Sequence, residues 1–546
     1  MRNPQIEFDF GLLPIVRHKI AFIAFFFIIL SVLWKTIVFL YKIYIMKLPF
    51  VFLLLCTPYL LSAQNDGLLL SGFGQNGIQE ILIGDEQVVL RDAKETSDGK
   101  IIYLGSAIDP ETNFLRTFSA RILENGETDT DFRLKFFKIQ NQETVGKSLA
   151  IQKDGKSVIC GWYNNGSNYD IFLLRQDIYG ELDFFFASGS IVQIFDFGGN
   201  DFGMSVTLDK DDNILLCGRA FRPGTGNDIV LIKFDKNGNI IPSFGNQGKI
   251  TLDFGASEIP YDIKIDESGA IYMAVDSDNN GVTKMAAVKC LANGNPDPLF
   301  GNGGISAHLV GQGQASTINL DVDKNGNVVL VGNETAINKN VSSLTVVGLF
   351  QDGSLNTAFN NIDTVFRFTF DNGTYGTGIT FTPDQNILIL GYGLSNIGSD
   401  FALLKMKTNG AFNPDFGFFG TAINNLGANS EASARLLLLQ DGNVLATGYS
   451  SIDKKLFFAK YSNTILSSVT NTLDQGLTVY PNPSSGKVHI VANEKIKQLT
   501  VFDKIGKLIH TQSNVSEEIS LDLPKGQYIL LCTLKDQVVQ KLLFIE

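Results

Sequence analysis

The sequence predicts an all-β fold, a seven-bladed β-propeller of four-stranded repeats of about 57 residues followed by a small C-terminal β-sandwich. The first observation is a tight turn followed by an apolar run, and successive copies of it lie 56 to 59 residues apart. The runs end at Gly105, Gly161, Gly218, Val275, Gly332, Gly391 and Gly448. The second is an aromatic residue on a similar period, at Phe73, Phe132, Phe186, Phe244, Phe300, Phe359 and Phe416. Two landmarks with a shared period indicate a repeat architecture.

Each repeat contains four segments with the composition of β-strands. In one copy they cover residues 248–254, 260–266, 269–275 and 285–291, with short apolar runs bounded by glycine, asparagine or aspartate. Radial repetition of such units favours a propeller over residues 70–463. The sequence leaves the phase of the blades open, but if the blades are cut within the repeat, the first strand must join the last three to close the ring. A β-solenoid is the alternative, although its coils are typically much shorter.

The repeated phenylalanines stand in turn motifs such as "SFGNQGKI", where paired glycines permit a sharp change of direction. We expect each ring to fill the seam between adjacent units. Units reading "DGKxxxxG" and then "FxLxRxxxxGxLDxxFGxxGxv" resemble the delta-60 repeat family from residue 73 to about 462. The second and fifth units depart from the motif and keep only the aromatic residue. The resemblance implies the fold and carries no activity with it.

The N-terminal region has the features of an export signal. Residues 46–63 combine one lysine, an apolar run and small residues, which predicts a signal peptide cleaved between Ala63 and Gln64. A methionine at this start suggests that residues 1–45 are an over-extended start. The alternatives are a membrane segment over residues 20–45 and a lipid anchor at Cys56, although leucines precede that cysteine.

After a polar linker at 464–476, residues 477–546 predict a small β-sandwich. The segments "VYPNPSSG", "VFDKIGKLI" and "LPKGQYIL", with a final lysine before apolar residues, resemble the type A sorting domain of the type IX secretion system. The motif residues are Tyr480, Pro481, Asn482, Pro483, Gly486, Gly506, Gly526 and Tyr528. The resemblance implies recognition by that secretion machinery, passage across the outer membrane of a Gram-negative bacterium, and release or attachment at the cell surface. An ordinary sandwich module is the alternative.

Composition argues against several classes of function. The net charge is −12 and no cluster of lysine and arginine offsets it, so nucleic acid is not an expected partner. The five cysteines form no CxxC pair, and the repeats contain one histidine, His308, so neither a disulfide framework nor a zinc site is expected. Cys160 and Cys217 occupy one slot of adjacent units, as small buried side chains would.

Repeated acidic residues offer the remaining candidates for chemistry. Asp321, Asp323 and Asn325 resemble the start of a calcium loop, but glycine stands at its twelfth position, so we favour a structural turn and keep weak Ca²⁺ binding as the alternative. A propeller could bring Asp170, Asp228 and Asp400 toward one face as glycosidase carboxylates. All three precede the fourth strand of a unit, which favours a repeated structural role.

Because the polar residues recur in equivalent turns, we expect a noncatalytic binding scaffold with no catalytic residue, no cofactor and an unknown protein or glycan ligand. A secreted glycan-active hydrolase or lyase on the same fold is the alternative.

Overall fold

The computed structural model describes residues 66–463, apart from 85–86, 312–314, 336–340, 360–363, 370–371, 396–397, 418–419 and 427–430. It also describes residues 477–545, apart from 481–486, 493–494, 504–507, 516–517 and 534–537. Within these ranges every element is a β-strand except the short 3₁₀ helix η2 (Phe186–Gly189). No helix of the described residues meets the length and hydropathy needed to cross a membrane.

Seven four-stranded antiparallel sheets form the blades, as the sequence predicts. Blade 1 contains β2 (Val88–Glu95), β3 (Ile101–Ile108), β4 (Leu115–Ile122) and β5 (Lys135–Phe137). Blade 2 contains β6 (Thr144–Ile151), β7 (Ser157–Asn164), β8 (Tyr169–Gln176) and β9 (Val192–Phe195). Blade 3 contains β10 (Asp201–Leu208), β11 (Ile214–Arg222), β12 (Gly226–Phe234) and β13 (Lys249–Leu252). Blade 4 contains β14 (Ser257–Ile265), β15 (Ile271–Asn279), β16 (Val282–Cys290) and β17 (Ile305–His308).

The remaining blades complete the ring. Blade 5 contains β18 (Ala315–Val322), β19 (Val328–Thr335), β20 (Ser342–Leu349) and β21 (Val365–Phe368). Blade 6 contains β22 (Thr374–Phe381), β23 (Asn386–Ser395), β24 (Gly398–Lys407) and β25 (Thr421–Asn424). Blade 7 contains β26 (Ala432–Leu438), β27 (Val444–Ser450), β28 (Lys455–Tyr461) and β1 (Ile78–Leu82).

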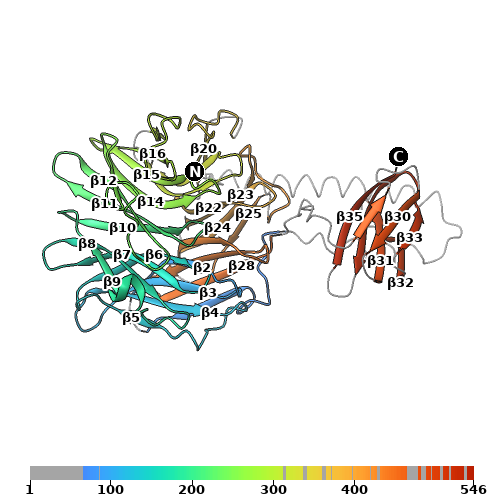
Figure 1. Cartoon of the computed structure of the whole chain (residues 1–546), viewed down its shortest axis with the longest axis horizontal. Coiled ribbons are helices and arrows are strands. Elements are labelled where there is room, and N and C mark those ends of the chain that lie inside the picture. Colours follow the sequence, from blue (N-terminus) through green and yellow to red (C-terminus); the bar gives the residue numbers. More distant parts are fainter. Residues whose placement is uncertain are drawn as a thin grey trace, which may run out of the picture. The chain divides into compact units, whose positions relative to one another are not determined.

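The two ends of the propeller segment meet in blade 7. Strand β1 is the outer strand of this blade and pairs antiparallel with β28, so the predicted closure by the first strand is confirmed. The preceding segment also pairs here, because Leu69 bridges Tyr461 and the Gly67 amide donates to the Ser462 carbonyl. In Figure 1, blue strands of blade 1 lie beside the orange β28, and β2 contacts both β26 and β27.

Apolar side chains between neighbouring blades form the core. The middle strands are buried on both faces because each blade is packed between two others, and β7 and β20 are almost entirely buried. One cluster combines Tyr103 and Phe118 of blade 1 with Leu445, Leu456 and Phe458 of blade 7. The core therefore continues across the closure.

The first strands of the blades contact one another around the ring, in the order β2, β6, β10, β14, β18, β22, β26 and back to β2. Figure 1 labels five of them, β2, β6, β10, β14 and β22. Each first strand carries a β-bulge at an equivalent position. A bulge leaves one residue unpaired and re-aims its side chain, so these seven positions define the lining of the propeller centre.

The C-terminal strands form two sheets. One contains β29 (Leu477–Tyr480), β30 (Lys487–Ala492) and β33 (Glu518–Asp522). The other contains β32 (Leu508–Val515), β31 (Ile496–Asp503), β34 (Gly526–Thr533) and β35 (Val538–Ile545). Val488 and Ile490 of the first sheet share a buried cluster with Leu499, Val501 and Leu530 of the second.

Candidate functional site

The seven predicted seam phenylalanines are all buried, with at most 3% of their surface exposed. Six of the rings pack against a glycine in the turn of the next blade, and the turn glycines are Gly126, Gly180, Gly238, Gly294, Gly353 and Gly67. At Gly238, φ is +88° and an added Cβ would lie 2.3 Å from the Phe186 ring. The turn therefore needs glycine for its backbone conformation and also for the space that the ring occupies.

A basic side chain covers five of these rings. The pairs are Arg121 with Phe132, Arg175 with Phe186, Lys233 with Phe244, Lys289 with Phe300, and Lys405 with Phe416, at 4.8 to 6.0 Å from the ring centroid. Most of these cations also pair with a carboxylate of the same blade, as Arg175 does with Asp183. The seam is thus a repeated structural unit of ring, glycine and ion pair.

Blade 5 lacks this cation. Gly348 occupies the register position that Lys233 and Lys289 hold in other blades. A cavity of about 450 Å³ lies there, lined by Gly348, Phe359, Asp323 and Gln385 among others. The absence of a long side chain at Gly348 contributes to the hollow at this point of the seam.

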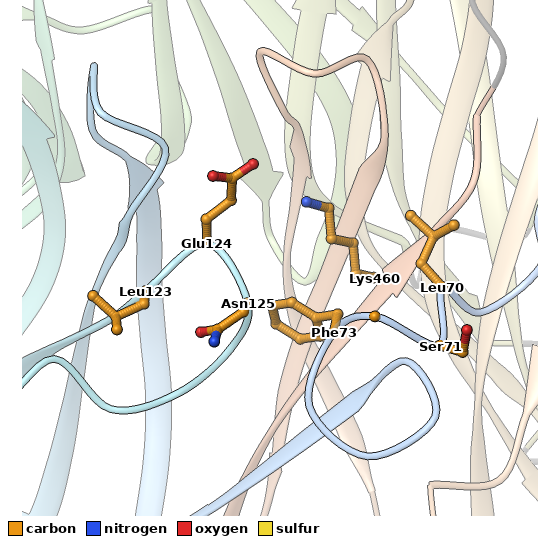
Figure 2. Close-up of a pocket in the computed structure, with 8 residues that line it drawn as sticks. Leu70, Ser71, Phe73, Leu123, Glu124, Asn125 and Lys460 are labelled. Atoms are coloured by element: carbon orange, nitrogen blue, oxygen red, sulfur yellow. The ribbon is translucent and has the colours of Figure 1, made fainter.

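The closing seam between blades 7 and 1 contains a further cavity, of about 600 Å³. Figure 2 shows the Phe73 ring beside Asn125, with Glu124 and Lys460 extending from opposite sides. Lys460 is already paired with Asp441 at 2.8 Å. This hollow follows from closing the ring with an N-terminal segment.

A continuous belt of hydrogen bonds runs around part of the propeller centre, through the residues that follow the bulges. Asp92 accepts from Ser148 at 2.9 Å and from Arg435 at 3.0 Å, which links blade 1 to blades 2 and 7. Asp262 accepts from Ser205 at 3.3 Å and from Asn319 at 2.9 Å, which links blade 4 to blades 3 and 5. The belt fixes neighbouring blades to each other and satisfies these buried polar groups.

Three cations gather beside this belt. Arg91 and Lys147 are the bulged residues of β2 and β6, and with Arg435 they line a cavity of about 190 Å³. The same bulge position holds an uncharged residue in each of the other five blades, namely Met204, Tyr261, Ile318, Thr377 and Ala434. At the bulge position, the positive charge is therefore confined to blades 1 and 2.

The cations are incompletely neutralised. Arg435 pairs with Asp92, but the buried Nε of Arg91 has no hydrogen-bond partner, and among the described residues no carboxylate pairs with Lys147. Burial, together with the nearby Arg91 and Arg435, lowers the pKa of Lys147 to about 7. Burial also lowers the pKa of Arg91, which still leaves it charged at neutral pH. Asp92 pairs with Arg435 and lies near Lys147. Asp262 lies near Arg435, so carboxylates offset part of the positive charge around the cavity.

In the calcium-like turn at Asp321, Asp323 and Asn325, both aspartates accept hydrogen bonds from backbone amides. Asp323 accepts from the backbone amides of Asn325 and Asn327, and Asp321 accepts from Phe381 of the next blade. Asp170 and Asp228 begin equivalent strands, where they contribute to two carboxylate groups, whereas Asp400 accepts from the amide of Asn425.

Other predicted residues have ordinary surroundings or lie outside the described residues. Cys160 and Cys217 are fully buried, and burial raises the pKa of both thiols, as expected for inert side chains. His308 contacts Ser306 at 2.6 Å. The predicted cleavage site, Ala63 and Gln64, is not among the described residues.

The sorting motif is described only in part. The described members are Tyr480, which ends β29, Gly526, which begins β34, and Tyr528, whose hydroxyl donates to the Pro524 carbonyl at 2.8 Å. The other motif residues, Pro481, Asn482, Pro483, Gly486 and Gly506, lie outside the described residues.

The cationic cavity is not apparent from local clusters in the sequence, because each basic residue stands alone in the chain. The signal was present, since Arg91 and Lys147 occupy one repeat slot that is uncharged in the other units. Comparing the slot across units, instead of searching for local clusters, would have found it.

A family model for the secretion system C-terminal sorting domain matches residues 478–546. The tail therefore carries a type IX sorting domain, as its motifs predict, which implies recognition by that machinery and a secreted or cell-surface location. The match covers the tail alone, and the delta-60 resemblance of the propeller stays a prediction. No curated protein matches the chain.

Solved structures similar to this chain include three with a low identity. PorZ, a surface component of the type-IX secretion system of Porphyromonas gingivalis, is 11% identical with a TM-score of 0.36, over 83% of this chain and 59% of PorZ. A PL25 ulvan lyase is 11% identical with a TM-score of 0.42, over 70% and 96%. Drosophila Semaphorin 2a is 8% identical with a TM-score of 0.41, over 84% and 96%. At these values the similarities say nothing of activity.

Proposed function

We propose that the protein is an exported, noncatalytic binding propeller that holds an anionic group of a glycan, a carboxylate or a sulfate ester, in the cavity at its centre. The observation that carries this proposal is the grouping of Arg91, Lys147 and Arg435 around one cavity in a chain of net charge −12. Nothing in the propeller fold demands a cation at the position of Arg91 and Lys147, because the other five blades have an uncharged residue at this bulge.

The side chains suit an oxyanion. A guanidinium group offers paired donors that match carboxylate and sulfate oxygens, and Arg91 has a donor that no protein group uses. The hydroxyl-bearing residues Tyr261, Thr377 and Ser433 line the same cavity. Its volume of about 190 Å³ corresponds to roughly six water molecules at about 30 Å³ each. That space is large enough for one charged group of a glycan.

Binding measurements on the full-length protein test the proposal. Calorimetry with uronate-terminated and sulfated oligosaccharides should show binding, and neutral oligosaccharides of equal length should show none. Arg91→Gln should weaken binding at least tenfold, whereas Arg133→Gln, a change at an exposed turn residue, should leave it unaltered. Equal binding by the Arg91→Gln variant, or capture of acidic peptides without any acidic glycan, would sink the proposal.

A lyase is the second candidate, because Lys147 is near half-neutral at pH 7 and lies beside cations that could neutralise a uronate carboxylate. In that reaction Lys147 would remove the C5 proton next to the carboxylate as a general base, the C4=C5 double bond would form as the C4–O bond to the leaving sugar breaks, and the leaving oxygen would take up a proton from water. Accumulation of unsaturated uronate, lost in Lys147→Met, would replace the binding proposal with this one.

We also propose the route of export. The signal peptide at 46–63 directs passage through the inner membrane, and the two tail sheets pack as a β-sandwich that presents the sorting motif. The shared buried cluster of the two sheets supports this arrangement.

A further inference from the structure

Two carboxylate clusters recur at successive blade crossovers. Asp170, Asp196 and Asp201 meet where the chain passes from β9 of blade 2 to β10 of blade 3. One repeat later the cluster consists of Asp228, Asp253 and Glu258, between blades 3 and 4. In each cluster the three carboxylates offer oxygens within 4.8 Å of one another.

The buried members have oxygens without partners. Asp170, Asp201, Asp228 and Glu258 are at most 4% exposed. Asp201 accepts from the Phe197 amide and Glu258 from the Ala256 amide, but each uses one oxygen only. The second oxygen of both, and one oxygen each of Asp170 and Asp228, is buried with no hydrogen-bond partner. Buried charge of this kind requires a cation or a proton.

The crossover itself does not require three carboxylates. Between blades 6 and 7 the equivalent residues are Asp400, Asn425 and Glu431, and the Asn425 amide donates to Asp400 at 2.8 Å. Between blades 4 and 5 the chain has Lys284, Leu309 and Ala315 instead. The protein thus contains one crossover in which an amide replaces the third carboxylate, between blades 6 and 7, and one in which all three carboxylates are absent, between blades 4 and 5.

We propose that each of the two clusters binds a Ca²⁺ ion that fixes the crossover between neighbouring blades. Hard carboxylate oxygens are the ligands Ca²⁺ prefers, and two ligands at 2.3 to 2.6 Å from one ion lie at most about 5 Å apart. The separation of the carboxylate oxygens meets this limit. Backbone carbonyls and water complete the coordination, as is usual for this ion.

The two clusters differ in the cations near them. Among the described residues no ion pair joins a cation to the first cluster, whereas Arg222 forms an ion pair with Asp228 of the second at 3.3 Å.

Calorimetry and thermal melting of the full-length protein test the proposal. We expect two Ca²⁺ ions per chain, with affinities of roughly 10⁻⁴ to 10⁻³ M as in other extracellular modules, and a melting temperature that EDTA lowers. Mg²⁺ at equal concentration should not restore it, because Mg²⁺ sheds its water reluctantly.

Matched variants distinguish the sites. Asp196→Asn and Asp253→Asn copy the arrangement at Asn425, so each should lose one ion and the double variant both, with an unchanged circular dichroism spectrum. Asp196 and Asp253 are exposed, so these changes should leave the fold intact. Asp323→Asn, in the calcium-like turn, should keep both ions. Absence of binding at about 10 mM Ca²⁺, two ions in the double variant, or loss in Asp323→Asn would overturn the proposal.

Discussion

The packing between neighbouring blades depends on single glycines in their turns. The seam brings a ring from one blade into the turn of the next, and the turn residue there has both a positive φ and no room for a methyl group. In the second unit, Ala187 and Ser188 adopt positive φ angles of 51° and 58° directly after Phe186, although neither is glycine. Phe186 is nevertheless fully buried, so packing of the ring outweighs the local backbone cost.

Replacing a seam glycine should destabilise the propeller through steric overlap. In Gly238→Ala the new methyl would lie 2.3 Å from the Phe186 ring, so the ring has to move, and we expect a loss of about 3 kcal/mol. Gly198→Ala is the control, because its φ is +96° but nothing lies within 4 Å, and it should lose only about 1 kcal/mol. Thermal melting of both variants gives the comparison, and equal melting temperatures would contradict the role of the ring.

The cationic cavity should respond to pH through Lys147. Its pKa is about 7 in the folded protein against the ordinary 10.5, so its charge is lost as the pH rises through 7. Anion binding should therefore weaken between pH 6 and about 8. Between pH 7 and 10.5 the folded state binds fewer protons than the unfolded state, so the free energy of unfolding rises with pH in this window. Below pH 7 the charged, buried lysine destabilises the folded state, and this destabilisation is lost as the pH rises to 10.5. Titrations of an acidic glycan at several pH values check this prediction. In Lys147→Met the affinity should no longer depend on pH, and an unchanged pH dependence in this variant would show that another group is responsible.

At the scale of strands, the sequence predicts which strands exist and their order better than it predicts the register in which they pair. Apolar runs between turn residues predict the four strands of a blade, because burial on both faces demands such runs. The bulges are invisible in that pattern, since one unpaired residue changes neither the apolar run nor the turns. Those bulges place Arg91 and Lys147 at the propeller centre, so the strand pattern alone does not reveal the cavity, and only a comparison of one slot across the repeats sets these two residues apart.

Closure of the ring depends on one short strand and the segment before it. Removing residues 66–82 should leave β28 with an unpaired edge, lower the melting temperature by more than 10 °C, roughly the effect of several kcal/mol, and promote association of chains. A synthetic peptide of the same residues should restore melting by adding the missing strand, and a scrambled peptide should not. A truncated chain that melts like the full-length protein would show that β1 is dispensable.

For the whole molecule, the sequence repeat made the propeller fold predictable, but it made candidate ligand-binding residues harder to recognise. A fixed period, read from Phe73 to Phe416, is sufficient for the blade count because every unit must bury the same face against its neighbour. The same logic led us to interpret Asp170 and Asp228 as structural, because they recur. Only the three-dimensional arrangement brings Asp196 and Asp253, which stand elsewhere in the repeat, beside them.

The sorting domain that directs export lies in the C-terminal tail, which the propeller does not need for folding. The blade cores and the closing strand all fall within residues 66–463, and the tail has its own buried cluster. Deleting residues 477–546 should therefore leave a folded propeller that crosses the inner membrane and stays in the periplasm. Cell fractionation with an antibody to the propeller measures this, and melting of the recovered protein confirms that it is folded. If the truncated protein still reaches the cell surface or the medium, the tail is not its export signal, because the remaining residues would then carry the address themselves.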